Sequence, residues 1–445
     1  MAANFENAII AILSVTVVLG VMIFVHEWGH FIAAKLSGVK VEVFSFGFGT
    51  RLFGVKRGDT DYRLSALPFG GYVRMAGDNP IEERTGAPYE FLSKPRWVRV
   101  LIACAGPAMN IIFGFLIFWG IFWIVGTPSE DYLRQPAQIA AVPLDSTPAP
   151  KVQSGDRIVD VNGVSTPTWE SVFNQLKDAQ PNASFTFTVQ QENAQKKLTG
   201  TIPAPPDTID SVLGYPLVPP VADEIAIGSP AEHAGMKEGD KIIAMDGKPI
   251  VTWPQLVEGV RHSDGRPIQF IVLRDGKDVS FDIAPARGMA LDGSSVWQVG
   301  VSPKVQEKFE RQHLLEAGNI AAVQTAVGVK QIGMVLGGLF TGKVKIRQLS
   351  SVVGIARESG RAAKRGPVDL IWLMAIISLN LGLLNLLPIP ILDGGHVLML
   401  AIEGILRRDL SLAVKERFVQ VGLVFLLGIF AFVMYSDIFK LVQSH

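Results

Sequence analysis

The stretch that decides the fold runs from Ala8 to His30 and reads AIIAILSVTVVLGVMIFVHEWGH. Its first part, up to Val25, is an apolar run close to the ~20 residues that a helix needs to cross a bilayer. Its last five residues form the pattern H-E-x-x-H, with histidines at positions 26 and 30. Residues four apart on a helix share one face, so both imidazoles can reach the same metal ion. The stretch therefore predicts a metal site at the end of a membrane span.

The composition indicates a chain that lies only partly in a membrane. Its 445 residues are 48% hydrophobic and 18% charged, and they are too many for one ordinary domain. Basic and acidic residues balance at 41 each, so the net charge gives no information about a nucleic-acid partner, and none is expected. We expect spans in the lipid bilayer combined with soluble modules. The single cysteine, Cys104, rules out an intrachain disulfide and is expected to be a buried small residue.

Hydropathy predicts a polytopic α-helical membrane protein with four transmembrane helices. The first lies within residues 1–34, and no Lys or Arg precedes Lys35, so we expect a retained span and not a cleaved leader. The other three are expected within residues 97–125, 367–395 and 418–441. Each offers close to the ~20 apolar residues that a span requires.

The basic residues predict how these spans are oriented. Residues 35–96 contain ten lysines and arginines, and residues 396–417 contain four more. Positive charge collects on the cytoplasmic side of short loops. We therefore expect both segments to be cytoplasmic. The long segment 126–366 is then extracytoplasmic, in the periplasm if the cell is Gram-negative.

The stretch NLLPIPILDGGH, residues 385–396, supplies the candidate third metal ligand. Two prolines interrupt a helix, and Asp-Gly-Gly permits a sharp turn that brings Asp393 inward. Broken backbone at membrane depth survives only where protein buries it or a watered cavity adjoins it. The alternative for Asp393 is an ordinary helix cap. His396 is expected to pack or to cap, because three ligands are already supplied.

Together these residues predict a catalytic zinc site. Catalytic Zn²⁺ takes three protein ligands and keeps one open position, which His26, His30 and Asp393 would provide. Glu27 then lies beside the metal as the general base for a water molecule. Two histidines and a glutamate on an exposed helix would form a mere solvated face. At the end of an apolar span, such ionisable groups are costly and indicate function.

Residues 319–340 form an apolar segment whose placement is less direct. Gln324, Lys330 and Gln331 interrupt it. We expect an amphipathic helix at the membrane interface, within a connector of residues 306–366. A fifth span here would also reverse the third and hold Asp393 up to ~30 Å from the histidines.

A repeat occupies the segment between the second and third predicted spans. The sequence GDRIVDVNG at 155–163 recurs as GDKIIAMDG at 239–247, and Trp169 recurs at the same offset as Trp253. This predicts two copies of one module of about 80 residues. The alternating runs 185–189 and 268–273 predict strands, and the Asn-Gly and Asp-Gly pairs predict tight hairpin turns.

The second copy resembles a PDZ domain in the sequence SPAEHAGM at 229–236, which is followed by Gly239 and Asp240. The resemblance implies two extracytoplasmic PDZ-like α+β domains, at 126–203 and 221–305, joined by a Pro-rich linker. The first copy departs from the pattern at 146–151, which puts its peptide binding in doubt.

PDZ domains bind peptide ligands as an added strand. The sequence LGYP at 213–216 is either a carboxylate-binding loop or a linker turn. A rigid steric screen without a peptide ligand is the alternative for both modules.

The paired motifs H-E-x-x-H and N-x-x-P-x-P-x-x-D-G resemble those of the site-2 protease family of intramembrane zinc metalloproteases, over nearly the whole chain. The resemblance implies a multi-pass protein of the bacterial inner membrane, with its active site towards the cytoplasmic side. It implies substrates that span the membrane once, namely anti-sigma factors and remnant signal peptides, cleaved in an envelope stress response.

The same resemblance assigns roles to two further parts of the chain. It implies that Asn385 holds substrate backbone; the alternative is a buried amide that satisfies the broken helix. It also implies that residues 35–96 form a membrane-associated β-hairpin or sheet that binds substrate by strand addition. The alternating runs 39–49 and 62–75 equally allow an ordinary cytoplasmic hairpin.

Two other classes of protein compete with this interpretation. A non-catalytic PDZ scaffold that binds misfolded envelope proteins would tolerate a damaged motif, yet all the motif residues are present. A soluble secreted zinc protease would require removal of the first span.

Overall fold

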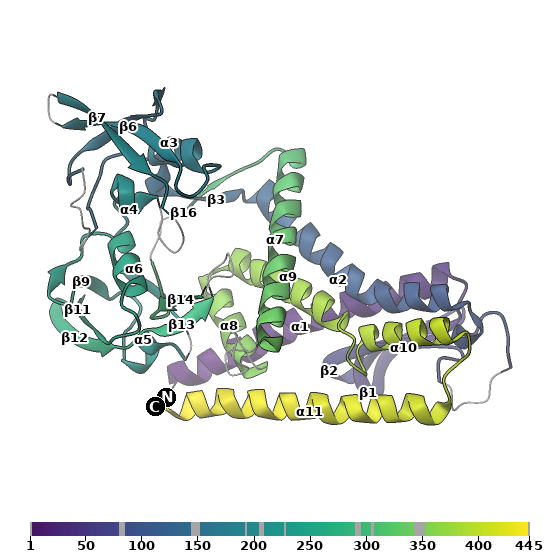
Figure 1. Cartoon of the computed structure of the whole chain (residues 1–445). Helices are drawn as coiled ribbons and strands as arrows, with labels where there is room; N and C mark the ends of the chain where they lie inside the picture. The colour runs from purple at the N-terminus through teal and green to yellow at the C-terminus, as the bar shows by residue number, and fades with distance from the viewer. Residues whose placement is uncertain are drawn as a thin grey trace. The chain divides into compact units, whose positions relative to one another are not determined.

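The computed structural model describes residues 2–79, 85–143, 152–191, 194–203, 209–226, 228–289, 295–303, 307–341 and 352–443. They form two compact units (Figure 1). The first combines Met1–Thr127 with Arg311–Phe439, and the second combines Pro128–Glu310 with Lys440–His445.

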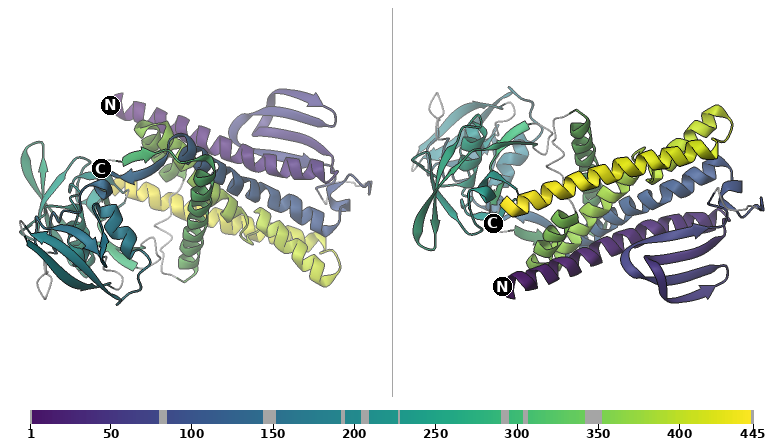
Figure 2. Two further views of the ribbon diagram at one scale, coloured as in Figure 1. Left: turned by 90° about the horizontal axis from the view of Figure 1, so that it is seen from above. Right: turned by 90° about the horizontal axis from the view of Figure 1, so that it is seen from below.

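The first unit is built mainly of helices. Its helices are α1 (Ala2–Leu36), α2 (Arg96–Ile124), α7 (Leu314–Phe340), α8 (Val352–Arg365), α9 (Pro367–Asn385), α10 (Asp393–Leu406) and α11 (Leu412–Gln443). Figure 2 shows that α1 and α9 run in the same direction, that α2 and α11 run the opposite way, and that α7 lies across them.

Among the residues that the structure describes, four helical segments are long and apolar enough to cross a membrane by length and composition: Ala8–Leu36, Arg96–Ile124, Leu314–Leu339 and Pro367–Asn385. Helix α11 covers the fourth span predicted from the sequence. The segment that we expect to be interfacial, in α7, thus meets the same criterion as the spans.

The helix ends follow from local sequence. The chain leaves α1 at Gly38, whose φ of 67° is the left-handed conformation that ends many helices, and Val39 N–H donates back to Ala34 O at 2.9 Å. Helices α2 and α9 begin directly after Pro95 and at Pro367, where a missing N–H costs nothing. The segment after residue 396, expected as a connecting loop, is instead helical to Leu406.

Small residues let the central helices approach closely. A Cβ atom added to Gly29 of α1 would lie 2.4 Å from the Ala105 carbonyl oxygen of α2. On the other side of α2, a Cβ at Gly114 would lie 2.9 Å from Leu379 of α9. Close backbone contact of this kind packs helices where hydrophobic burial gives no driving force. Helix α2 is therefore clamped between α1 and α9.

The strands β1 (Val41–Arg57) and β2 (Thr60–Met75) follow α1 and contain the two alternating runs noted in the sequence. Both strands are long and bent. The double pairing of Phe44, with Val73 and with Tyr62, shows that two parts of β2 lie on either side of the start of β1. As a result, residues 71–75 form one edge of the sheet and residues 51–57 the other.

The second unit contains two four-stranded sheets with matching strand order, β5-β4-β6-β7 and β10-β9-β11-β12. The strands of the first are β4 (Arg157–Val161), β5 (Val164–Ser165), β6 (Ser184–Gln191) and β7 (Ala194–Thr201). Those of the second are β9 (Lys241–Met245), β10 (Lys248–Pro249), β11 (Ile268–Arg274) and β12 (Lys277–Ile283).

Shorter elements complete the second unit. They are β3 (Thr127–Glu130), which starts on the last residue of the first unit, α4 (Asp210–Leu213), β8 (Ala222–Ile225), α5 (Pro230–His233), β13 (Ala286–Met289), β14 (Ser295–Gln298), β15 (Val301–Pro303) and β16 (Glu307–Glu310).

The repeated sequence features occupy matching places in the two sheets. The turns carry positive φ at Asn162 and Asp246 and at the glycines that follow them, which confirms the predicted tight hairpin turns. Each repeated tryptophan begins a helix, α3 (Trp169–Leu176) or α6 (Trp253–Arg261), and is buried in the core of its own module.

The linker stretch 213–216 joins the two modules. Tyr215 is buried, its N–H donates to Ala141 O at 2.8 Å, and its hydroxyl hydrogen-bonds to Glu258 of α6. A carboxylate-binding loop offers free backbone N–H groups, whereas this N–H is already used, which favours the linker turn. Residues 146–151, where the first copy departs from the PDZ pattern, lie outside the described residues.

Candidate metal centre

Three metal-ligating side chains from two distant parts of the chain meet in the first unit. The Nε2 atom of His26 lies 3.1 Å from one carboxylate oxygen of Asp393, and Nε2 of His30 lies 3.5 Å from the other. The ligand atoms of the three residues all lie within 4.8 Å of one another. Both histidines are only 9% exposed. Helix α1 and the start of α10 therefore bring together the three candidates named from the sequence.

The broken segment between α9 and α10 delivers Asp393. Helix α9 ends at Asn385, and short-range turns such as Leu387 N–H to Leu384 O (3.1 Å) carry the chain to Leu392. A Cβ on Gly394 would lie 2.2 Å from the Leu387 carbonyl oxygen, and one on Gly395 would lie 2.3 Å from that of Ile389. Only glycine fits at either position. The Asp-Gly-Gly sequence is thus what lets the carboxylate turn towards the histidines.

Helix α2 fixes the ring of His30. The Nδ1–H of His30 donates to the Ile102 carbonyl oxygen at 2.8 Å. With its proton on Nδ1, the ring presents the Nε2 lone pair to Asp393, as a metal ligand must. Gly106, one turn further along α2, leaves room for the ring, because a Cβ there would lie 2.3 Å from Nε2.

The second histidine also touches α2. The Nδ1 atom of His26 lies 3.3 Å from the side-chain amide of Asn110. Ile102, Gly106 and Asn110 are spaced by four residues and face the two histidines from one side of the helix. The sequence analysis did not single out any of the three. Their spacing on a predicted span was the available signal, but its meaning depends on α2 lying against α1.

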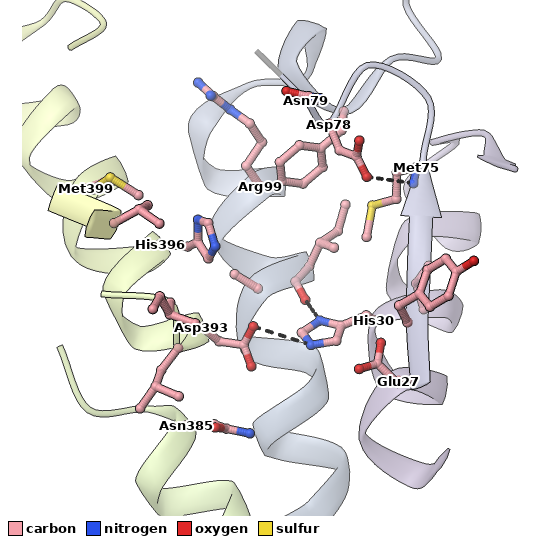
Figure 3. Close-up of a pocket in the computed structure, with 18 of the residues that line it drawn as sticks. Glu27, His30, Met75, Asp78, Asn79, Arg99, Asn385, Asp393, His396 and Met399 are labelled. Atoms are coloured by element: carbon pink, nitrogen blue, oxygen red, sulfur yellow. Dashed lines mark hydrogen bonds and ion pairs between the residues drawn. The ribbon is translucent and has the colours of Figure 1, made fainter. Parts of the chain in front are cut away.

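A cavity of about 1060 Å³ opens beside the three ligands. Glu27 and Asn385 line it together with His26, His30 and Asp393, so every site residue predicted from the sequence adjoins one space. Figure 3 shows Asp393 and His30 facing each other, Glu27 beside the strand β2, and Asn385 below Asp393. His396 lines the same cavity one turn along α10, and its backbone N–H closes the turn to Leu392 O at 3.3 Å.

One edge of the β-sheet faces this cavity. Gly70, Gly71, Tyr72 and Val73 of β2 line it. The Glu27 carboxylate accepts a hydrogen bond from the backbone of Val73, and Met75 N–H donates to Asp78 at 2.9 Å. The candidate base and a sheet edge are therefore in direct contact.

The donor set suits a zinc ion. Two imidazole Nε2 atoms lie 3.2 Å apart and face an ionised carboxylate. With a proton on Nδ1 of each ring, no hydrogen lies between the three groups, and their lone pairs converge on one point. Two imidazoles with a single carboxylate, and an open side towards a cavity, form the usual ligand set of a hydrolytic zinc enzyme. The residues present fit the metal.

Apolar helices that enclose a His-His-Asp cluster, with a glutamate beside it, define an intramembrane metalloprotease. The model of peptidase family M50, the site-2 protease family, matches residues 14–429 of this chain. The chain belongs to that family and is a zinc metalloprotease.

Its relatives are similar over almost their full length. The chain is 33% identical to the regulator of sigma-E protease RseP of Escherichia coli, over 96% of this chain and 98% of the relative. It is 32% identical to the Salmonella typhimurium protein of that name, over 96% and 97%. A putative zinc metalloprotease of Vibrio cholerae is 31% identical, over 96% and 97%.

Proposed function

We propose that this membrane protease cleaves single-span membrane proteins, with His26, His30 and Asp393 as zinc ligands and Glu27 as the general base. The observation that carries the proposal is the meeting of two imidazoles from α1 with one carboxylate from α10, at ligand distance of one another and beside a cavity. A non-catalytic scaffold would not need this arrangement. The span-length helices argue against a soluble secreted protease.

The residues around the cavity have separate tasks in this mechanism. When bound, zinc supplies Lewis acidity that makes water more acidic and polarises a carbonyl group. Glu27 takes a proton from water and passes it to the leaving amine. Asn385 donates to substrate backbone that has left its own helix. Because Asn385 is the last residue of α9, its amide is held at the start of the broken segment.

The edge strand of β2 is the proposed docking site for the unwound substrate. Residues 71–75 form a sheet edge, and most of them line the cavity. An extended peptide added to this edge would run past the metal ligands, and its backbone would replace the bonds that Glu27 and Asp78 make to Val73 and Met75. The contact between Glu27 and Val73 supports this placement, because it puts the base beside the docked backbone.

We infer a membrane orientation from the same unit. Four helices, α1, α2, α9 and α11, run side by side along a common direction. Their exposed apolar side chains, such as Leu13, Leu116 and Val424, suit contact with lipid. Helix α7 crosses this common direction, which supports an interfacial position despite its apolar length. With four spans, the basic segments place the metal ligands towards the cytoplasmic side and residues 128–310 in the periplasm.

The second unit is proposed to be a pair of PDZ-like domains that screens substrates. Matching strand order and matching Trp-initiated helices support two related modules. The proposed substrates are anti-sigma factors and remnant signal peptides whose extracytoplasmic part has already been shortened, in an envelope stress response. The names of the relatives from Escherichia coli and Salmonella typhimurium, regulators of sigma-E, agree with this class.

The proposal is tested by incubating the detergent-purified protein with a model single-span substrate, with and without a zinc chelator. We expect cleavage that the chelator stops and added zinc restores. Glu27→Gln should keep its zinc and lose at least about 100-fold in rate, because it cannot accept a proton. Cleavage at the normal rate by Glu27→Gln would show that another group is the base.

A further inference from the structure

Asn110 of α2 has an unusual hydrogen-bonding position. It is fully buried, at 0% exposure, and its amide nitrogen lies 3.3 Å from Nδ1 of His26. Within the described part of the chain, its amide oxygen has no hydrogen-bond partner. The oxygen and nitrogen of an amide can exchange places within the same shape, so a second arrangement of these groups exists.

Rotating the Asn110 amide by half a turn provides that arrangement. The oxygen then takes the place of the nitrogen, 3.3 Å from His26 Nδ1, and accepts its N–H. The rotation pairs the oxygen in place of the nitrogen and moves the imidazole proton to Nδ1. Nε2 of His26, which is 3.1 Å from Asp393, is then a bare lone pair. In the unrotated form the proton would occupy Nε2 and block it as a ligand.

The neighbouring histidine follows the same rule. His30 donates its Nδ1–H to the Ile102 carbonyl oxygen of α2 at 2.8 Å, which leaves Nε2 free. Ile102 and Asn110 lie two turns apart on one face of α2, as the two histidines lie one turn apart on α1. The backbone of Asn110 is itself held, because Ser378 Oγ of α9 donates to its carbonyl oxygen at 2.7 Å.

We propose that Asn110 is a positioning residue of the metal site, which accepts the Nδ1–H of His26 through its amide oxygen and directs Nε2 to the metal. The inference rests on the proposed zinc ligands. It assigns α2 a definite task, since this helix supplies the acceptor behind each of the two imidazoles. Loss of such an acceptor typically weakens metal binding 10–100-fold.

Zinc affinity of the detergent-purified full chain, measured by competition with a chelator of known affinity, tests the inference. Asn110→Leu keeps the branched shape of the side chain but removes the acceptor, and we expect zinc binding to weaken about 10–100-fold. The matched control is Gly120→Ala on the same helix, whose added Cβ has no atom within 4 Å, and it should leave affinity unchanged. Zinc binding by Asn110→Leu as tight as that of the unmodified chain would overturn the inference.

Asn110→Asp tests the acceptor role of Asn110 even if Asn110→Leu fails to fold. An ionised carboxylate can only accept, so it replaces the proposed oxygen, and zinc affinity should stay within a few-fold of the unmodified value. If an acceptor at this position is not what supports zinc binding, Asn110→Asp should lose affinity as far as Asn110→Leu does. That result would overturn the role given to Asn110 but not the proposed zinc ligands. Undiminished zinc binding by His30→Ala would overturn the proposed metal site as well.

Discussion

At the scale of single residues, the site depends on a glycine, Gly106, as well as on its ligands. Gly106 leaves the space that the His30 ring fills, because a Cβ would lie 2.3 Å from Nε2. We expect Gly106→Ala to displace the ring and to weaken zinc binding about 10-fold or more, together with activity. Metal content and cleavage rate of the purified variant measure this.

A second glycine of α2 provides the control for this change. Gly120 has nothing within 4 Å of its added Cβ, so Gly120→Ala should leave zinc binding and cleavage as they are. If both alanine variants behave alike, the helix would be responding to lost glycine flexibility and not to the histidine. Local sequence does not distinguish these two glycines, because their surroundings depend on other helices.

At the scale of elements, the break between α9 and α10 is the feature on which the site depends most. Gly395 packs so tightly that a Cβ would lie 2.3 Å from the Ile389 carbonyl oxygen. Gly395→Ala should therefore shift Asp393 and reduce both zinc content and cleavage by about 10-fold or more. Gly404→Ala, later in the same helix with no atom within 4 Å, is the matched control and should change neither.

A buried ion pair predicts how the second module responds to acid. Asp240 is 1% exposed and accepts from Arg274 at 2.7 and 2.6 Å. Burial acts against ionisation, but the Arg274 hydrogen bonds, the backbone N–H of Lys237 and the charges of both residues together outweigh it and hold the pKa of Asp240 below its ordinary value. A depressed pKa adds stability above the unfolded pKa, near 3.9, and this stability is lost as the pH falls through the folded value.

Removing the arginine should abolish that contribution. We expect Arg274→Met to lower the free energy of unfolding of the second unit by about 3 kcal/mol at neutral pH, and to move acid unfolding to higher pH. Protease resistance of the full chain across a pH series measures both. Arg266→Met removes an exposed ion pair with Asp246 and should have a far smaller effect. Equal effects of the two variants would contradict the role given to burial.

The elements also show what sequence reasoning can and cannot reach. Hydropathy, the H-E-x-x-H spacing and the Asp-Gly-Gly turn are local signals, and they are sufficient to identify His26, His30, Glu27 and Asp393 as candidates. The helix after residue 396 was missed because its glycines and basic end resemble a loop. The partners of the histidines on α2 were missed because only packing of α2 against α1 gives their spacing a meaning.

At the scale of the whole molecule, the proposed screen makes a prediction about substrate size. If the second unit admits only shortened substrates, a single-span protein with a folded extracytoplasmic domain should be cleaved much more slowly than the same span with a short tail. Initial rates with the two substrates, at equal concentration in one detergent, measure the difference. Glu27→Gln is the blank for both. Equal rates would show that residues 128–310 do not select by size.

The membrane placement of the chain is the part that sequence predicts least directly. Helix α7 has the length and apolarity of a span, yet it lies across the helices that share one axis. Hydropathy measures composition and not direction. Labelling of single cysteines introduced at the exposed Val323 and at Gly337, in a chain with Cys104→Ser, distinguishes the two placements. An interfacial helix leaves both positions open to a water-soluble reagent, whereas a span protects at least one of them.

The central claim is that α1 and the start of α10 hold one zinc ion between them, and the zinc content of Asp393→Ala tests it most directly. In the purified full chain we predict close to one zinc per unmodified molecule, and loss of most of it in Asp393→Ala and in His30→Ala. The control Gly404→Ala should retain its zinc. Zinc retained by Asp393→Ala at the level and affinity of the unmodified protein would contradict the account.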